Sequence, residues 1–98
     1  MTKHTVIVAF KGLDFDRDNQ FTQALLDDSL KCYDGTGFDF SANERHHWFY
    51  VTDETLDFVV NDIERTFSAT GLTGTVTVKK KGEHVVPKAV EDQAKAGD

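Results

Sequence analysis

The sequence contains little cysteine and little proline, with Cys32 and Pro87 the single residue of each type. One cysteine excludes an intramolecular disulfide framework and any metal site built from several cysteines. The longest apolar runs reach five or six residues, whereas a helix that spans a bilayer needs roughly 20. No signal peptide is recognisable before the first strand-like run. We therefore expect a cytoplasmic protein, either of a cell or of a virus acting inside a host cell.

The composition is that of one globular domain. The 98 residues have a mass of 11.0 kDa, and 39% of them are hydrophobic, including eight Phe, one Trp and two Tyr. Such a chain has room for one small core and none for a second domain. We place this domain at residues 1–82. Residues 83–98, rich in Ala, Lys and Asp, are predicted to form a flexible C-terminal extension.

Charge is distributed unevenly along the chain. The whole sequence has a net charge of −6, with a net of −7 over residues 1–70 and +1 over residues 71–98. An acidic body repels phosphate backbones and attracts basic protein surfaces. The basic run at residues 79–81 is predicted to be a solvated strand end that blocks edge-to-edge pairing.

The hydrophobic pattern predicts the order β-α-β-β-α-β. The second helix is the clearest, because Leu56, Val59 and Ile63 recur at helical spacing between a good N-cap, Thr52, and a helix-terminating Gly71. Two crossovers joined by a hairpin predict an α+β, ferredoxin-like βαββαβ sandwich, a four-stranded antiparallel sheet with two helices on one face. The predicted strands are 4–10, 38–42, 46–51 and 72–80, and the predicted helices are 17–33 and 52–71.

Alternation along the strands assigns one face of the sheet to the core. The first and third strands are expected at the centre. The residues predicted to lie beneath the helices are Val6, Val8, Phe10, Phe38, Phe40, Phe49, Val51, Val76 and Val78. Cys32 is predicted to be buried on the apolar stripe of the first helix, where a thiol is normally inert.

The same alternation leaves large side chains on the uncovered face. Trp48 and Tyr50 are expected beside Ile7 at its centre, with His46 and Asp39 on the same face. An exposed apolar cluster on a small domain marks an interaction site. In the alternative register, Trp48 would be core and its neighbour exposed. We favour the first register, because residues 49 and 51 are the more purely apolar pair.

The uncovered face has three physical uses: self-association, docking of another protein, and stacking of nucleic-acid bases. The strand order and the alternating Trp48 and Tyr50 resemble the RNA-recognition module. That module has a basic residue and a glycine where this chain has His46 and His47, and an aromatic residue where it has Ile7. The negative net charge also removes the electrostatic contribution to such binding. Nucleic-acid binding is therefore a minor alternative.

A second candidate surface lies on the second helix. Phe58 falls off the apolar stripe and is expected on the solvent side together with Asp57, Asp62 and Glu64. An aromatic side chain surrounded by acidic residues is suited to binding a basic partner. The alternative is that Phe58 lies at the rim of the helix and is partly covered by the protein itself. The full set of predicted partner-binding residues is Ile7, Asp39, His46, Trp48, Tyr50, Asp57, Phe58, Asp62 and Glu64.

Motifs for metal binding and catalysis are incomplete. Asp14-x-Asp16-x-Asp18 begins like a calcium loop, but the sixth position is Asn19 and the twelfth is Leu25, where the loop requires Gly and Glu. These acids are better suited to capping a helix. Adjacent histidines on a strand, at 46 and 47, point to opposite faces and cannot easily share a metal ion. We expect no metal site and no cofactor.

The sequence therefore favours a small acidic, non-enzymatic protein-binding inhibitor or adaptor. Its size and charge resemble those of viral proteins that block basic nucleic-acid-binding surfaces of host proteins, anti-CRISPR proteins among them. The alternative is a homodimeric small-molecule-binding or regulatory domain that associates through the open sheet. An enzyme using His46 and Asp39 in a cleft ranks lowest.

Overall fold

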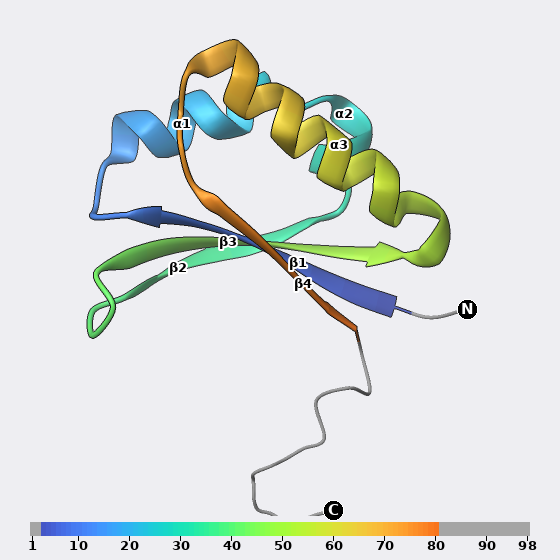
Figure 1. The fold of residues 1–98 in the computed structure, drawn as a ribbon, viewed down its shortest axis with the longest axis horizontal. Coiled ribbons are helices and arrows are strands. Elements are labelled where there is room, and N and C mark those ends of the chain that lie inside the picture. Colours follow the sequence, from blue (N-terminus) through green and yellow to red (C-terminus); the bar gives the residue numbers. More distant parts are fainter. Residues whose placement is uncertain (1–2, 81–98) are drawn as a thin grey trace, which may run out of the picture.

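A computed structural model describes residues 3–80 of the chain. Strands β1 (Lys3–Lys11), β2 (Tyr33–Asp39), β3 (Glu44–Thr52) and β4 (Thr75–Lys80) form one antiparallel sheet in the order β2-β3-β1-β4. Helices α1 (Phe15–Ala24), α2 (Asp27–Leu30) and α3 (Asp53–Thr70) all lie on one side of it (Figure 1). The α+β class and the central place of the first and third strands are confirmed. The predicted extension at 83–98 lies outside the described residues.

The register predicted for the central strands is confirmed. Val6 and Val8 on β1 are completely buried, and so is Phe49 on β3. Ile7 is half-buried on the other face, where it is paired with Trp48 of β3 and Thr77 of β4. The two faces therefore differ as the period of two requires: the helices cover one face, and no other element within residues 3–80 covers the opposite one.

Helix α3 forms where its apolar periodicity predicts it. The Thr52 N–H donates to Thr55 Oγ1 over 3.0 Å at the start of the helix. Gly71 ends it with a φ of 77°, and its N–H donates to the Phe67 carbonyl. Val59 and Ile63 are completely buried against the sheet. Local capping and long-range packing thus specify the same helix.

The first predicted helix, 17–33, is wrong in extent. Asp14 caps α1 by accepting the Arg17 N–H, but the chain becomes extended at Leu25 and Leu26 before the single turn of α2. Helix α3 supplies partners for the backbone groups freed by this break. Asp62 accepts the Leu26 N–H over 2.9 Å, and an Arg65 N–H donates to the Ala24 carbonyl over 2.8 Å. Residues 3–80 therefore contain three helices where two were predicted.

The second strand also differs from the prediction, which placed it at 38–42. Strand β2 begins at Tyr33 and includes Gly35 and Gly37, residues that weaken an isolated strand. The indole of Trp48 covers this part of the strand, because a Cβ placed on Gly37 would lie only 2.8 Å from Trp48 Cη2. The glycines are tolerated since a neighbouring aromatic ring covers their exposed backbone.

Three predicted core positions lie elsewhere. Phe40 falls in the β2–β3 turn and is 85% exposed. Val78 is exposed because β4 is an edge strand, while α3 packs mainly on β1 and β3. Cys32 lies between α2 and β2 rather than on a helix, and it is half-buried. The misplacements of Phe40 and Cys32 follow from the shifted boundaries of the second strand and the first helix, whereas that of Val78 follows from its position on an edge strand.

Candidate functional site

The predicted partner-binding residues divide between opposite sides of the molecule. Ile7, His46, Trp48 and Tyr50 share the uncovered face of the sheet, and Asp39 joins them by its pairing with Glu44. Asp57, Phe58, Asp62 and Glu64 belong to α3 on the other side (Figure 1). One flat partner surface cannot contact both sets. The sequence-based site is therefore two separate surfaces, and they require separate tests.

The uncovered sheet face is less apolar than its residue types suggest. One side of the Trp48 indole is already in contact with β2. Tyr50 is 42% exposed, and the Lys3 Nζ lies 5.3 Å from the centroid of its ring. By register, Lys11 and Lys79 also lie on this face. The surface is a half-buried aromatic centre with lysines near its margins.

The two polar residues predicted on this face are engaged by their own neighbours. Asp39 Oδ1 accepts from the Ser41 hydroxyl over 2.7 Å and from the Ser41 N–H over 3.0 Å, which closes the β2–β3 turn. These bonds lower the pKa of Asp39, the Ser41 hydroxyl most strongly. His46 Nε2 lies 3.1 Å from Glu44 Oε1. The contact with His46 is the main reason that the pKa of Glu44 is lowered, and Lys11 adds to it.

The acidic residues gather in the helical layer. The three helices contain nine acidic and two basic residues, a net charge of −7, whereas the four strands contain five basic and three acidic residues, a net charge of +2. Seven of the nine helical acids are exposed. The two arginines of this layer, Arg17 and Arg65, both donate hydrogen bonds within the protein. The outer side of the helices therefore presents almost only negative charge.

Asp62 is an exception to this pattern and corrects the prediction that placed it on the solvent side. It is 4% exposed. Its Oδ2 accepts the Leu26 N–H, and its Oδ1 accepts from Arg65 Nε over 2.9 Å and Nη2 over 2.6 Å. Burial raises its pKa, but the Ser29 hydroxyl, the Leu26 N–H and Arg65 together lower it by more, so the pKa lies below its ordinary value. Asp62 joins the two helical segments and takes no part in a docking surface.

Apolar side chains interrupt the acidic layer at a few points. Phe58 is 41% exposed on α3, one turn before Asp62. Leu26 and Leu30 are exposed beside the break between α1 and α2. Large apolar groups surrounded by charge are the usual anatomy of an energetic anchor at a protein interface.

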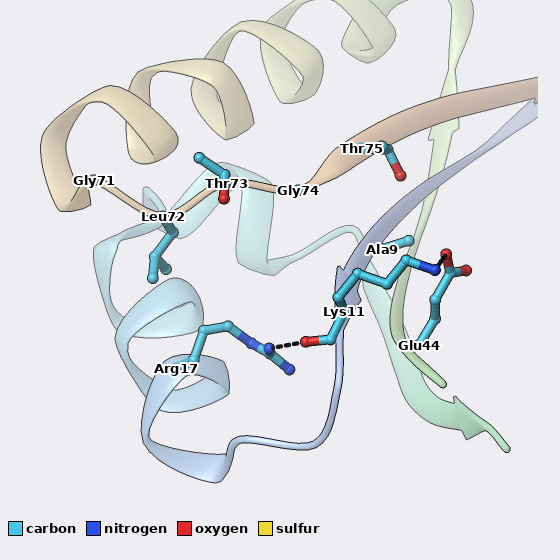
Figure 2. A pocket seen from close by; sticks show the side chains of 9 residues that line it. All are labelled: Ala9, Lys11, Arg17, Glu44, Gly71, Leu72, Thr73, Gly74 and Thr75. Atoms are coloured by element: carbon cyan, nitrogen blue, oxygen red, sulfur yellow. Dashed lines mark hydrogen bonds and ion pairs between the residues drawn. The ribbon is translucent and has the colours of Figure 1, made fainter. Parts of the chain in front are cut away.

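Two hollows indent the described part of the protein. The first, of about 500 Å³, lies between the loop from Gly71 to Gly74, the end of β1 and the start of α1 (Figure 2). Arg17 donates to the Lys11 carbonyl over 2.6 Å and to the Gly12 carbonyl over 2.8 Å. Lys11 Nζ pairs with Glu44 Oε2 over 3.1 Å. Lys11 and both Nη atoms of Arg17 thus have partners within the protein, whereas Arg17 Nε is buried without a hydrogen bond.

The second hollow, of about 510 Å³, contains a polar cluster that the sequence analysis missed. His47 is almost completely buried on the helix side of β3. Its Nδ1 lies 2.8 Å from the Tyr33 hydroxyl and its Nε2 lies 3.1 Å from Asp18 Oδ1. A carboxylate can only accept, so the geometry assigns the proton to Nε2 and leaves Nδ1 to accept the Tyr33 O–H. The hollow is lined by Phe15, Asp18, Asn19, Thr22, Leu30, Tyr33, Thr36, Arg45 and His47.

Both rings of this cluster are neutral near pH 7. Burial lowers the pKa of His47, although Asp18 acts in the opposite direction. Burial also raises the pKa of Tyr33. The cluster draws on α1, β2 and β3, so no local motif announces it. The signal that could have found it is the presence of Arg45 and His47 at alternate positions on the strand face assigned to the core.

Comparison with protein-family models, curated proteins and solved structures finds no match to this chain. Within residues 3–80, no three His, Cys, Asp or Glu side chains come together as metal ligands would. None of the described helices is long and apolar enough to cross a membrane.

Proposed function

We propose that this protein is a non-enzymatic binding module that docks through its helical layer on a basic surface of another protein. The observation that carries the proposal is the segregation of charge, with seven exposed acids on the helices and both helical arginines engaged internally. Complementary charge accelerates encounter and fixes orientation. A surface that normally binds a phosphate backbone supplies the matching lysines and arginines. We therefore propose a nucleic-acid-binding protein as the partner, and inhibition as the consequence.

Phe58 is the proposed anchor of this surface. It is exposed between Glu54 and Asp57 on one side and Asn61 on the other in the sequence of α3. Charged contacts at the rim of an interface contribute mainly to rate and specificity, whereas a buried aromatic ring contributes more to affinity. We therefore propose that the acidic side chains orient the protein on its partner and that the Phe58 ring slows dissociation of the complex.

We also infer that the arrangement is ferredoxin-like. The support is the strand order β2-β3-β1-β4 with antiparallel neighbours throughout and the helices on one face. The extra turn α2 lies within the connection from β1 to β2. It extends that crossover without changing the order of the strands.

The test measures binding of a fluorescent arginine-rich peptide by anisotropy at low and physiological salt. The helix variant Glu54→Lys/Asp57→Lys/Glu64→Lys is expected to weaken binding at least about tenfold, and added salt should weaken wild-type binding. Phe58→Ala should mainly increase the dissociation rate. The matched control reverses charge on the other side with Lys79→Glu and should leave affinity unchanged. Equal affinity for wild type and the triple variant would refute the proposed surface, as would tighter binding of a single-stranded oligonucleotide.

A second candidate function is self-association through the uncovered sheet face. Tyr50 is the most exposed aromatic side chain of that face, and Ile7 and Trp48 are half-buried beside it. Light scattering over a range of concentrations distinguishes monomer from dimer. Tyr50→Glu would disrupt such a dimer without removing the Trp48 ring that covers β2. A wild-type protein that stays monomeric at high concentration would exclude this candidate.

A further inference from the structure

Arg45 is a charged group whose hydrogen-bonding capacity the described part of the protein leaves unused. Its side chain is 12% exposed and lines the second hollow. Among residues 3–80 its guanidinium donates no hydrogen bond, and Nε is fully buried and makes none. Nε lies 3.0 Å from Asp18 Oδ2, an ion pair whose geometry does not make a hydrogen bond. A guanidinium has five N–H donors, and such a group inside a protein normally has partners.

The surroundings hold this guanidinium in place. Its Cζ lies 5.7 Å from the centroid of the Phe15 ring and 5.9 Å from that of Phe38. Arginine commonly packs against aromatic rings in this way and keeps its N–H edge free for another group. By contrast, Arg17 beside the other hollow donates to two backbone carbonyls. Arg17 Nε is also buried without a hydrogen bond, but the Arg17 Nη atoms donate to the backbone, whereas Arg45 donates no side-chain hydrogen bond within residues 3–80.

The local charge favours a ligand with one negative charge. The Asp18 carboxylate faces two cations, Arg45 at 3.0 Å and Arg17 at 3.6 Å. The His47 and Tyr33 side chains hydrogen-bond each other and Asp18, and both are neutral because burial lowers the pKa of His47 and raises that of Tyr33. The cluster thus has one uncompensated positive charge in a largely desolvated place. A phosphate dianion would exceed this charge and approach the Asp18 carboxylate, whereas a carboxylate would neutralise it.

The rest of the lining is suited to an apolar body. Phe15, Leu30 and Tyr33 supply apolar surface from α1, α2 and β2 around the hollow, which has the volume of a small-molecule site. Carboxylates pair with arginine in a planar, two-bond arrangement. We propose that this hollow binds a small organic acid, with its carboxylate on Arg45 and its apolar part between Phe15, Leu30 and Tyr33. This site is independent of the helical docking surface.

The experiment is a titration of the ¹⁵N-labelled full chain followed by two-dimensional NMR. Benzoate is the probe, and benzyl alcohol, acetate and inorganic phosphate are the comparison compounds. Benzoate should shift the amides of residues around the hollow, at Thr36, Arg45 and His47. Benzyl alcohol lacks the charge and acetate lacks the apolar body, so each should bind at least about tenfold more weakly.

Variants separate the site from general folding. Arg45→Met should weaken benzoate binding at least about tenfold, while Lys11→Met, which removes a lysine from the other hollow, should leave it unchanged. Phe15→Ser changes an exposed ring and tests the apolar lining if Arg45→Met fails to fold. Shifts centred outside the hollow, equal binding by Arg45→Met or by benzyl alcohol, or tighter binding of phosphate would each overturn the proposal.

Discussion

Replacing Asp62 with alanine tests the account of how the helical layer holds together. The substitution removes the acceptor of the Leu26 N–H and of two Arg65 N–H groups. A hydrogen bond from a backbone N–H to a charged acceptor contributes about 1.5–3 kcal/mol. The pair with Arg65 contributes only about 0.5 kcal/mol, because the arginine side chain is 47% exposed. We therefore expect Asp62→Ala to lower the free energy of unfolding by about 2–3 kcal/mol.

Urea denaturation followed by far-ultraviolet circular dichroism measures this loss. With a denaturant slope of about 1 kcal/mol per molar, the midpoint should fall by about 2–3 M. Asp57→Ala is the matched control, since Asp57 is an exposed acid on the same helix, and it should stay within about 0.5 kcal/mol of wild type. Equal stabilities of the two variants would refute the assignment of Asp62 as a tie between α3 and the break after α1.

The pH dependence of stability provides an independent readout on the same residue. The pKa of Asp62 is lowered in the folded protein. Its contribution to stability is therefore present above the unfolded-state pKa, near 3.8, and is lost as pH falls through the lower folded-state pKa. Asp62→Asn, which keeps one acceptor oxygen, should lose less stability at neutral pH than alanine. In a plot of unfolding free energy against pH, Asp62→Asn should lack the decrease toward acid pH that protonation of Asp62 causes in the wild type.

Three further perturbations test other parts of the structure. The pKa of His47 is lowered in the folded protein, so the folded state resists protonation of this side chain. The free energy of unfolding should therefore fall as the pH drops below about 6.5. Urea titrations at a series of pH values should show that His47→Phe removes this pH dependence. Gly37→Ala places a methyl group 2.8 Å from the Trp48 ring; the indole must move, which should cost about 1–3 kcal/mol and shift the tryptophan fluorescence maximum. Unchanged fluorescence would contradict the packing of that ring on β2. Gly71 has a φ of 77°, so Gly71→Ala should lower the free energy of unfolding, measured by thermal unfolding, by about 1 kcal/mol. Ala69→Gly, at an exposed position of the same helix, is the comparison variant that changes helix propensity alone.

The sequence predicts those elements in which local and long-range preferences agree. In α3, the periodicity, the residue before the first turn and the terminal glycine all specify the same bounds. In β1 and β3, strict alternation identifies the buried side correctly, and Trp48 and Tyr50 lie on the uncovered face as expected. Both central strands were placed correctly for the same reason. Alternation is a strong signal wherever one face of a strand is buried.

The elements that sequence reasoning misplaced depend on distant partners. The periodicity of residues 17–33 continues through Leu25 and Leu26, and nothing nearby shows that Asp62 and Arg65 will receive the backbone groups of a break. The glycines at the start of β2 oppose strand formation until the ring of Trp48 covers them. In both places a tertiary contact overrides the local preference.

The candidate sites were predictable only in part. Side-chain type and alternation located the aromatic sheet face, and the sequence of α3 located Phe58 and its acidic neighbours. Asp62 was misassigned because an acid on a helix is usually solvated, whereas here an interhelical backbone N–H binds it. The cluster at Arg45 was missed, since its members become neighbours only when α1 packs on β2 and β3, and the alternation of Arg45 and His47 on the core face was the one sequence signal for it.

The opposite charges of the two layers make the described part of this small protein, residues 3–80, an electric dipole. Its negative pole is the helical side and its positive pole is the strand side, so the overall charge understates the field that a second molecule experiences at close range. Rotational diffusion in the field of a polycation would turn the helices toward it before contact. On a negatively charged surface the molecule would adhere through its strand side. Its retention on a cation-exchange resin at neutral pH would therefore exceed the retention that a net-negative protein normally shows.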